Sequence, residues 1–431
     1  MREELRFVAD ESPGRVARIQ GDLLRAHFAR LRDRSTYYAE ALSGIDPESI
    51  RNVEDILGLP FTTNADLESR NVDFLAVSRE RVIDHVTTSG TTGRPVAVML
   101  SEADLERLTA NEANSLRMAG VTARDVVQLM TTIDRRFMAG LAYYLGARAL
   151  GAGVVRVGPG AASLQWDSIL RFGTTTLITV PSFLVRLLEH ARQQGIDPAS
   201  TSVRKAVCIG EPIHDAEGRW NSLAQRIKAD WDIDLLGTYA STEMATACTE
   251  RWEGSGHAVQ PRLALFEVLD EKDRPVPDGG TGEVVVTPFH VEAMPLLRYR
   301  TGDICAWRSK PFSGEGQGMW LGPVLGRKQQ RMKVKGTTLY PAQVIDGMAS
   351  LSTIPNFVVI CTSDELGHDD LEILASVEDD EVEHLRNELR DRLRVAPRIT
   401  PVAHAAIEAM KWPKDSRKPQ LFIDRRTKHI G

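Results

Sequence analysis

Cysteine is scarce in this chain of 431 residues. The four cysteines stand singly, and no Cys-x-x-Cys pair occurs. We therefore expect neither a disulfide framework nor the oxidising compartment in which such frameworks form. The N-terminal stretch MREELRFVADESPG is charged and does not contain the apolar core of a secretory signal. These features together predict a cytoplasmic protein.

Long hydrophobic runs and an excess of basic charge are also missing. The most apolar segment, residues 137–157, contains glycines and Arg148, which makes it a poor membrane span. The net charge of −6 gives no reason to expect nucleic acid or an anionic membrane as a partner. Because 42% of the residues are hydrophobic and 26% are charged, the composition is that of a globular protein. The length predicts two or three domains.

Strand-like and helix-like segments alternate up to residue 235. Short apolar runs such as TLITV (176–180) and KAVCIG (205–210) are typical of parallel strands, which are buried on both faces. The segment between them predicts a helix that begins at Pro181 and stops at Gly195. Other helices are predicted over residues 16–42, from residue 66, over 101–120 and over 139–151. This alternation predicts a doubly wound α/β core.

The kind of predicted secondary structure changes after residue 235. The β-type runs LALFEVLD (263–270) and GEVVVTPF (282–289) are separated by the turn-rich stretch PVPDGGTG. The last hundred residues predict a further unit, with strands at FVVICT (357–362) and LEILASV (371–377) and a helix over residues 381–394. Neither a repeat nor a low-complexity tract accompanies this change.

One loop has an unusual composition. The stretch VTTSGTTGRPVAVM (86–99) lies between two predicted strands, and five of the seven residues from Thr87 to Gly93 carry a hydroxyl. The loop is too long for a plain hairpin turn. Its two glycines can turn backbone N–H groups toward one point, where the hydroxyls and Arg94 add further donors to an anion. The loop is not a Walker P-loop, and taken alone it is also compatible with a surface turn.

Further fragments follow this loop in a recognisable order. YASTE (239–243) ends in Glu243, a hard oxygen ligand that suits Mg²⁺. RYRTGDIC (298–305) places Asp303 after a turn, where its carboxylate can accept the two hydroxyls of a ribose. LGRKQQRMKVKG (325–336) contains Arg327, and DSRKPQLFIDRR (415–426) places Lys418 on an expected exposed loop. Each fragment alone is also compatible with an ordinary solvated surface segment. That all of them occur in this order by chance is improbable.

The ordered fragments resemble the motifs of the adenylate-forming superfamily of acyl-CoA synthetases, most closely its phenylacetate-CoA ligase branch. LPFTTNADL (59–67), CIGEP (208–212) and GTTLYPAQVIDGM (336–348) are similar to other elements of that branch, so the resemblance covers nearly the whole chain. It implies a large domain of doubly wound sheets with a β-rich subdomain, residues 1–327, which binds ATP and an acid. It also implies a small mobile α+β domain, residues 328–431.

The resemblance implies an activity in two steps. A small aromatic acid attacks the α-phosphate of ATP, which gives an acyl-adenylate and pyrophosphate, and the acyl group then passes to CoA. Lys418 would bridge the carboxylate and the α-phosphate, Glu243 would hold Mg²⁺, and Thr242 would lie beside the α-phosphate. A hinge near Gln329 would exchange Lys418 for the loop around Lys335 between the two steps.

The resemblance also implies nucleotide contacts and an acid pocket. The expected nucleotide and CoA contacts are Ser89, Gly90, Thr91, Thr92 and Gly93 for the phosphates, Gly210, Glu211, Pro212, Tyr239, Ala240 and Ser241 near the adenine, Asp303 and Arg327 for the ribose, and Lys335 and Gly336 for the second step. The expected walls of the acid pocket are Phe137, Gly140, Pro181 and Ser182. Phe137 would favour a flat ring in the substrate.

Some features leave alternatives open. Arg135 and Arg136 are unusual for the branch, and they could meet a polar group of the acid or be solvated. An adenylyltransferase that stops at the adenylate, or that uses an acceptor other than CoA, is the rival function. Some members of the branch carry a structural zinc, and Cys248 and His257 remain from such a ligand set, but the turn GPVLGR has no cysteine, so zinc is not expected. A homodimer is compatible with the resemblance.

Overall fold

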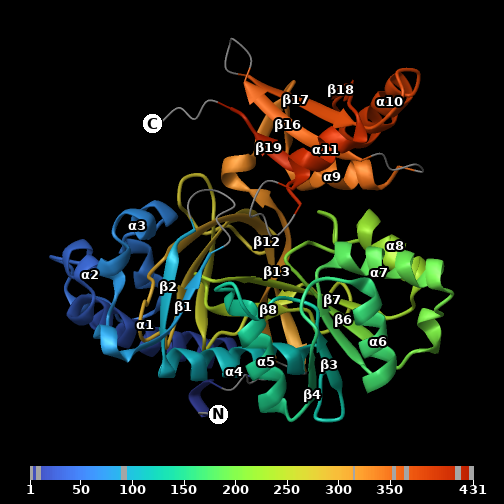
Figure 1. Ribbon diagram of the computed structural model, residues 1–431. Helices are drawn as coiled ribbons and strands as arrows, with labels where there is room; N and C mark the ends of the chain where they lie inside the picture. Colours follow the sequence, from blue (N-terminus) through green and yellow to red (C-terminus); the bar gives the residue numbers. More distant parts are fainter. Residues whose placement is uncertain are drawn as a thin grey trace. The chain divides into compact units, whose positions relative to one another are not determined.

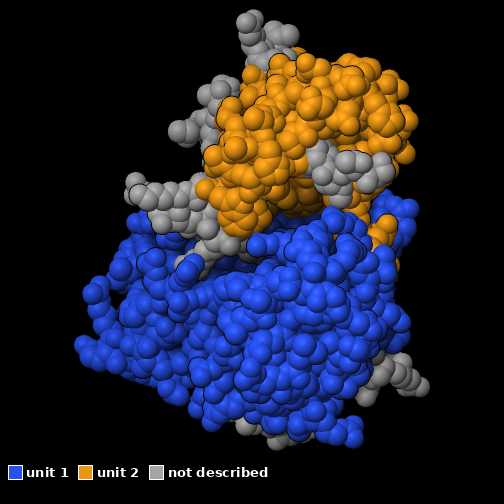
Figure 2. Space-filling model, turned by 45° about the vertical axis from the view of Figure 1, so that its right-hand side comes forward, with its two compact units in different colours: residues 1–219, 226–324 blue, residues 220–225, 325–431 orange. Residues whose placement is uncertain are grey.

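The computed structural model describes residues 3–5, 11–88, 95–313, 316–351, 356–363, 368–412 and 419–426. The chain forms two compact units, shown in different colours in Figure 2. Unit 1 contains residues 1–219 and 226–324, and unit 2 contains residues 220–225 and 325–431. The chain thus passes from unit 1 to unit 2 just before Arg327. No pattern in the sequence indicated that residues 220–225 belong to unit 2.

An 11-stranded mixed sheet forms the centre of unit 1 (Figure 1). Its parallel part consists, in spatial order, of β7 (Asp234–Ser241), β6 (Lys205–Ile209), β5 (Thr176–Thr179), β3 (Val126–Leu129) and β4 (Gly153–Arg156). The helices in the connections are α5 (Met138–Leu150), α6 (Ala162–Phe172), α7 (Pro181–Gln194) and α8 (Ser222–Asp230). The parallel strands and the predicted α7, with Pro181 at its first position and Gly195 in a left-handed cap, are confirmed.

The other part of this sheet is largely antiparallel and continues directly from β7. Its strands are, in spatial order, β8 (Thr246–Thr249), β9 (His257–Ala258), β13 (Gly316–Arg327), β12 (Tyr299–Ser313), β11 (Thr281–Pro288) and β10 (Ala264–Leu269). The predicted strands LALFEVLD and GEVVVTPF correspond to β10 and β11, which pair with each other. The β-rich region is therefore continuous with the parallel strands, and the fold is the expected α/β class.

The N-terminal helices differ from the prediction of one helix over residues 16–42. Two helices form, α1 (Pro13–Arg34) and α2 (Thr36–Ala41). Ser35 lies between them in an extended conformation, and its hydroxyl accepts a hydrogen bond from the N–H of Tyr38 at 3.4 Å. A serine that caps a new helix in this way competes with continuation of the preceding one, so the single-helix prediction was wrong.

The remaining elements of unit 1 include the predicted pair of strands around the hydroxyl-rich loop. β1 (Val82–Thr87) and β2 (Ala97–Ser101) are antiparallel partners, and α4 (Glu102–Met118) follows with Ser101 as its cap. The other short elements are α3 (Asn64–Ser69) and the 3₁₀ helices η1 (Glu3–Leu5), η2 (Pro47–Ser49), η3 (Val53–Gly58), η4 (Asn71–Phe74), η5 (Arg79–Arg81) and η6 (Pro198–Ser200). Among the described residues, no helix has the length and apolar character needed to cross a membrane.

Unit 2 is an α+β unit with its own apolar core. Its four-stranded sheet has the order β18 (Arg398–Pro401), β17 (Asp369–Ala375), β16 (Phe357–Ser363) and β19 (Phe422–Asp424). The other elements are η7 (Lys328–Gln330), the hairpin β14 (Met332–Val334) and β15 (Thr337–Leu339), and the helices α9 (Pro341–Ala349), α10 (Val382–Leu393) and α11 (His404–Lys411). The segment 220–225 is tied to α9, because the N–H of Ser222 donates to Asp346 at 2.8 Å.

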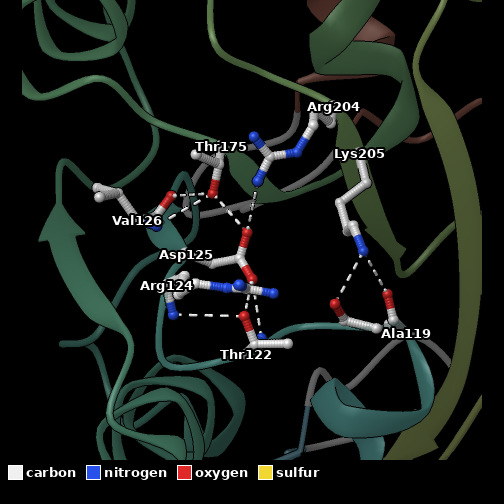
Figure 3. A network of polar contacts seen from close by, with 9 residues as sticks. Ala119, Thr122, Arg124, Asp125, Val126, Thr175, Arg204 and Lys205 are labelled. Atoms are coloured by element: carbon white, nitrogen blue, oxygen red, sulfur yellow. Dashed lines mark hydrogen bonds and ion pairs between the residues drawn. The ribbon is translucent and has the colours of Figure 1, made fainter.

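A buried carboxylate organises the N-terminal ends of the parallel strands (Figure 3). Asp125 precedes β3 and accepts from the Thr122 N–H at 2.8 Å, from the Thr175 hydroxyl at 2.8 Å and from Arg204 at 3.0 Å. Burial alone would raise the pKa of Asp125, but the hydrogen bonds from Thr122 and Thr175 outweigh it and hold the pKa below its usual value. Since Thr175 and Arg204 precede β5 and β6, the network joins the starts of three strands. The opposite, carboxyl edge is where ligands bind in such sheets.

Candidate active site

Residues that follow β5 and β6 meet at the carboxyl edge of the parallel strands. Glu211 accepts hydrogen bonds from the N–H and the hydroxyl of Ser182, both at 2.9 Å. Ser182 lies in the first turn of α7, after Pro181, so the carboxylate also lies at the positive end of a helix. Gly210 has φ +74°, a conformation that favours glycine. Glu211 and Ser182, predicted for the adenine and for the acid, thus lie side by side.

Tyr239 and Asp303 form a second contact between predicted site residues. The phenolic hydroxyl of Tyr239, on β7, donates to Asp303, on β12, at 2.9 Å. Both side chains are buried. Burial, and then the charge of Asp303, raise the pKa of Tyr239 well above its usual value, so this hydroxyl stays protonated. The two residues predicted for the adenine and the ribose are therefore brought into direct contact by β7 and β12.

The predicted magnesium ligand lies on a turn directly after β7. Glu243 is half-buried, and the hydroxyl of Tyr299 donates to its carboxylate over a long 3.4 Å. The turn is held by hydrogen bonds from the Met244 N–H to the Ser241 hydroxyl and from the Ala245 N–H to the Thr242 carbonyl. Mg²⁺ is usually held by one or two carboxylates together with phosphate oxygens and water. A carboxylate that accepts one long hydrogen bond from the residues that the structure describes fits that type of site.

Cys248 and His257 are the two residues that a zinc site would use. The part of the chain that the structure describes holds no group of three or more His, Cys, Asp or Glu side chains arranged to bind a metal. Cys248 lies opposite Tyr239 in the β7–β8 pair. His257 is buried, and its Nδ1 lies 3.2 Å from the carbonyl oxygen of Gly322. Burial lowers the pKa of this histidine.

The predicted acid side begins at α5. Phe137 is the half-buried residue that precedes this helix. Gly140 is buried, and a Cβ atom at this position would overlap the carbonyl oxygen of Thr132. The contact that the structure gives Gly140 is therefore close backbone packing. Arg135 and Arg136 are exposed and have φ values of +57° and +59°. The carbonyl of Arg136 accepts from the Thr87 N–H, which ties this turn to the end of β1.

Some predicted residues lie outside the described residues. These are Ser89, Gly90, Thr91, Thr92 and Gly93 of the hydroxyl-rich loop, and Lys418. The described residues on either side of the loop are paired: Thr88 donates its N–H to the Val96 carbonyl, and the Val96 N–H donates to the Thr88 hydroxyl, both at 3.0 Å.

Unit 2 carries the predicted residues of the second step. Lys335 and Gly336, with φ values of +48° and +83°, form the two-residue turn of the β14–β15 hairpin. Arg327 ends β13, and the carbonyl of Gln329 accepts from Arg426 at 2.8 Å. The expected hinge position is thus attached to a side chain near the C-terminus.

Sequence reasoning missed Tyr299, which contacts Glu243. Its strand is held by the LPFT segment: the Thr62 N–H donates to the Arg298 carbonyl, and the Arg300 N–H donates to the Thr62 carbonyl. The guanidinium groups of Arg298 and Arg300 both lie over the ring of Phe61, at 4.1 and 4.2 Å. The available signal was an aromatic residue between two arginines, shortly before Asp303 on the same strand.

Comparison with known proteins agrees with this geometry. Residues 59–291 match the AMP-binding enzyme family. The chain is 32% identical over 345 residues to the phenylacetate-coenzyme A ligase of Thermus thermophilus, covering 79% of this chain and 76% of that protein. It is 30% identical over 309 residues to the phenylacetate-coenzyme A ligase of Aromatoleum evansii, covering 70% and 67%.

A solved structure has the same fold. It is a 2-hydroxyisobutyryl-CoA ligase in the postadenylation state in complex with R3-HIB-AMP, with a TM-score of 0.80 at 19% identity. The match covers 98% of this chain and 96% of that one. The likeness therefore extends over both units of the chain.

Proposed function

The chain belongs to the AMP-binding enzyme family, and we propose from this premise that its acid substrate carries an aromatic ring. It is an AMP-forming acid–CoA ligase of the phenylacetate-CoA ligase branch. It activates a carboxylic acid with ATP and forms the CoA thioester. The observation that most supports the nucleotide site is the contact between Tyr239 and Asp303 beside the carboxyl ends of β5 to β7.

The first step brings two anions together, so the site must supply positive charge and orientation. We assign to Asp303 the role of accepting hydrogen bonds from the ribose hydroxyls. Tyr239 orients this carboxylate through its own hydrogen bond. Lys418 would neutralise charge between the carboxylate and the α-phosphate as the new bond forms. A compact ammonium on a long stem suits a group that acts in one step and leaves before the next.

We assign Mg²⁺ to Glu243. The support is the weak 3.4 Å contact to Tyr299 and the position of the turn directly after β7. A bound Mg²⁺ would neutralise phosphate charge near the attacked phosphorus. Thr242, the preceding residue, would donate its hydroxyl to the α-phosphate.

The aromatic acid is supported by Phe137 at the start of α5 and by relatives named as phenylacetate-coenzyme A ligases. An aromatic side chain favours an aromatic ligand through stacked or edge-to-face contacts. In the second step, the thiol of CoA attacks the acyl carbon, AMP leaves with the bonding electron pair, and the thiol proton passes to solvent. The hairpin turn at Lys335 and Gly336 would then face the site.

Pyrophosphate release over a panel of acids tests this proposal. The panel should contain phenylacetate, benzoate, indoleacetate and aliphatic acids of matched volume, each with and without CoA. We expect kcat/KM to be highest for an aromatic acid. A clear preference for an aliphatic acid would contradict the aromatic assignment and leave the ligase activity intact.

A further inference from the structure

One face of α4 carries polar side chains although it is buried. Arg107, Asn111 and Ser115 are spaced by four residues, so they share this face, and all three are buried. Each contacts the segment 245–249, which runs from the turn after Glu243 through β8. A polar helix face at a buried contact is costly unless its groups are paired, and here the pairing is complete for these three side chains.

The contacts follow the segment residue by residue. Arg107 donates to the Ala245 carbonyl and, at 3.0 Å, to the Thr246 hydroxyl. The carboxamide oxygen of Asn111 accepts from the Ala247 N–H at 3.1 Å, and the hydroxyl of Ser115 lies 2.5 Å from that of Thr249. Successive turns of α4 therefore hold successive positions of the segment.

Arg107 has the largest share of these contacts. It also donates to the carbonyls of Leu263, at 2.7 Å, and Phe289, at 2.5 Å. Burial lowers the pKa of this guanidinium to about 10, with Asp104 acting in the opposite direction, so it remains charged at neutral pH. Four acceptors around one planar group use the fork geometry that arginine has and lysine does not.

The position of α4 is itself determined at its N-terminus. Asp104 accepts hydrogen bonds from the Glu292 N–H at 2.5 Å and from the Ala293 N–H at 2.9 Å. The hydroxyl of Ser101 caps the helix. Arg107 is one turn away from this anchor, so its guanidinium has little freedom to move.

The residue that Arg107 holds has an unusual backbone. Ala245 has φ +47°, in the left-handed region that residues with a Cβ rarely adopt. Its other hydrogen bond, to the Thr242 carbonyl, measures 3.3 Å. The Ala245 carbonyl also accepts from the charged guanidinium of Arg107, so this donor stabilises the conformation of a residue in the turn that bears Thr242 and Glu243.

We propose that Arg107 is a positioning residue for nucleotide binding: it holds Ala245 in its left-handed conformation and thereby orients the Thr242–Glu243 turn toward the magnesium–ATP complex. The inference rests on the proposed roles of Thr242 and Glu243. It assigns a part in nucleotide binding to a side chain that touches neither the nucleotide nor the metal.

The test compares Arg107→Lys with Ser115→Ala, a variant at the far end of the same helix face. Binding of magnesium–ATP is measured by calorimetry without acid, and thermal melting and the KM for the acid are measured alongside. Arg107→Lys should weaken magnesium–ATP binding by about tenfold, the effect of losing hydrogen bonds from a charged group, and leave the acid KM nearly unchanged. Ser115→Ala should lower the melting temperature and leave ATP affinity unchanged.

A second variant tests the left-handed conformation of Ala245 directly. Ala245→Gly removes the conformational penalty of the left-handed backbone, so it should restore part of the ATP affinity in the Arg107→Lys background. Equal ATP affinity in Arg107→Lys and the parent protein would overturn the inference, as would a loss that Ala245→Gly leaves unchanged. Failure of the parent protein to bind magnesium–ATP would instead contradict the proposed function.

Discussion

The hydroxyl of Tyr239 lies 2.9 Å from a carboxylate oxygen of Asp303, although the two residues are separated by 64 positions in the sequence. The contact joins the last of the parallel strands, β7, to β12 in the antiparallel part of the same sheet. It therefore couples the two parts of unit 1 at the proposed nucleotide site. Its removal should affect ATP more than the acid.

Tyr239→Phe tests this relationship. The substitution keeps the ring but leaves Asp303 without its phenolic donor, and a lost hydrogen bond to a charged group is worth about 1.5–3 kcal/mol. We expect the KM for ATP to rise by about tenfold or more and the KM for the acid to change little. Asp125→Asn, at the opposite edge of the strands, is the control: it should lower the melting temperature without altering the KM for ATP. Equal effects on both substrates would argue against a nucleotide-side role for Tyr239.

Lys418→Ala tests the assignment that depends on the sequence resemblance alone. A group whose contact matures only as charge develops contributes to the transition state and not to ground-state binding. Acid-dependent exchange of pyrophosphate into ATP should therefore be lost, while calorimetric ATP binding survives. Unchanged exchange in this variant would refute the role of Lys418.

Glu243→Gln tests the magnesium assignment. The change keeps the shape of the side chain and removes the charge that a hard cation prefers. We expect half-maximal activity to require a higher Mg²⁺ concentration and the maximal rate to fall. A Mg²⁺ titration that superimposes on that of the parent protein would mean that another group holds the metal.

Phe137→Ala tests the acid pocket. A contact made equally in the ground and transition states contributes to KM, so the substitution should raise the KM for an aromatic acid and leave kcat nearly intact. The aromatic contact is worth about 0.5–1.5 kcal/mol beyond its buried area. If Phe137 were part of the core, its removal would instead cost about 3–5 kcal/mol of stability. A large fall in melting temperature with unchanged KM would therefore favour a structural role.

The buried carboxyl of Glu112 predicts how the stability of the protein depends on pH. Burial raises the pKa of this carboxyl to about 8, against the lowering effect of Asn111, and its Oε2 atom has no hydrogen-bond partner among the described residues. The native state keeps the proton up to about pH 8, whereas the unfolded state releases it near pH 4.5. The unfolded state thus binds fewer protons in this window, so the free energy of unfolding falls as the pH rises.

Glu112→Gln should remove this contribution. Its melting temperature should exceed that of the parent protein near pH 8, and the difference should shrink toward zero near pH 4.5. Thermal melts of the two proteins at matched ionic strength measure this directly. A difference that does not vary with pH would show that Glu112 does not titrate in this way.

Local signals in the sequence predicted much of the fold. Proline at position 181 and glycine at position 195 marked the ends of α7, and the apolar runs marked β5 and β6. The prediction of one helix over residues 16–42 was wrong because Ser35 could serve as a cap or as a helical residue, and only packing decides between them.

The site was harder to predict where its contacts are long-range. The hydrogen bond from Arg107 to Ala245 spans 138 positions, and no local pattern reveals it. The role of Gly140 as a wall of the acid pocket stays a prediction. A Cβ atom there would overlap the carbonyl oxygen of Thr132, so close backbone packing also favours glycine at this position. Tyr299 was missed because its contact with Glu243 arises only when β12 and the end of β7 come together.

We propose that this enzyme carries out both steps, from an aromatic acid to its CoA thioester. The most direct measurement is the ratio of thioester to AMP, determined by mass spectrometry after incubation with phenylacetate, magnesium–ATP and CoA. We expect one thioester for each AMP and no accumulation of acyl-adenylate. Pyrophosphate release and adenylate accumulation without thioester, in the presence of CoA, would contradict it.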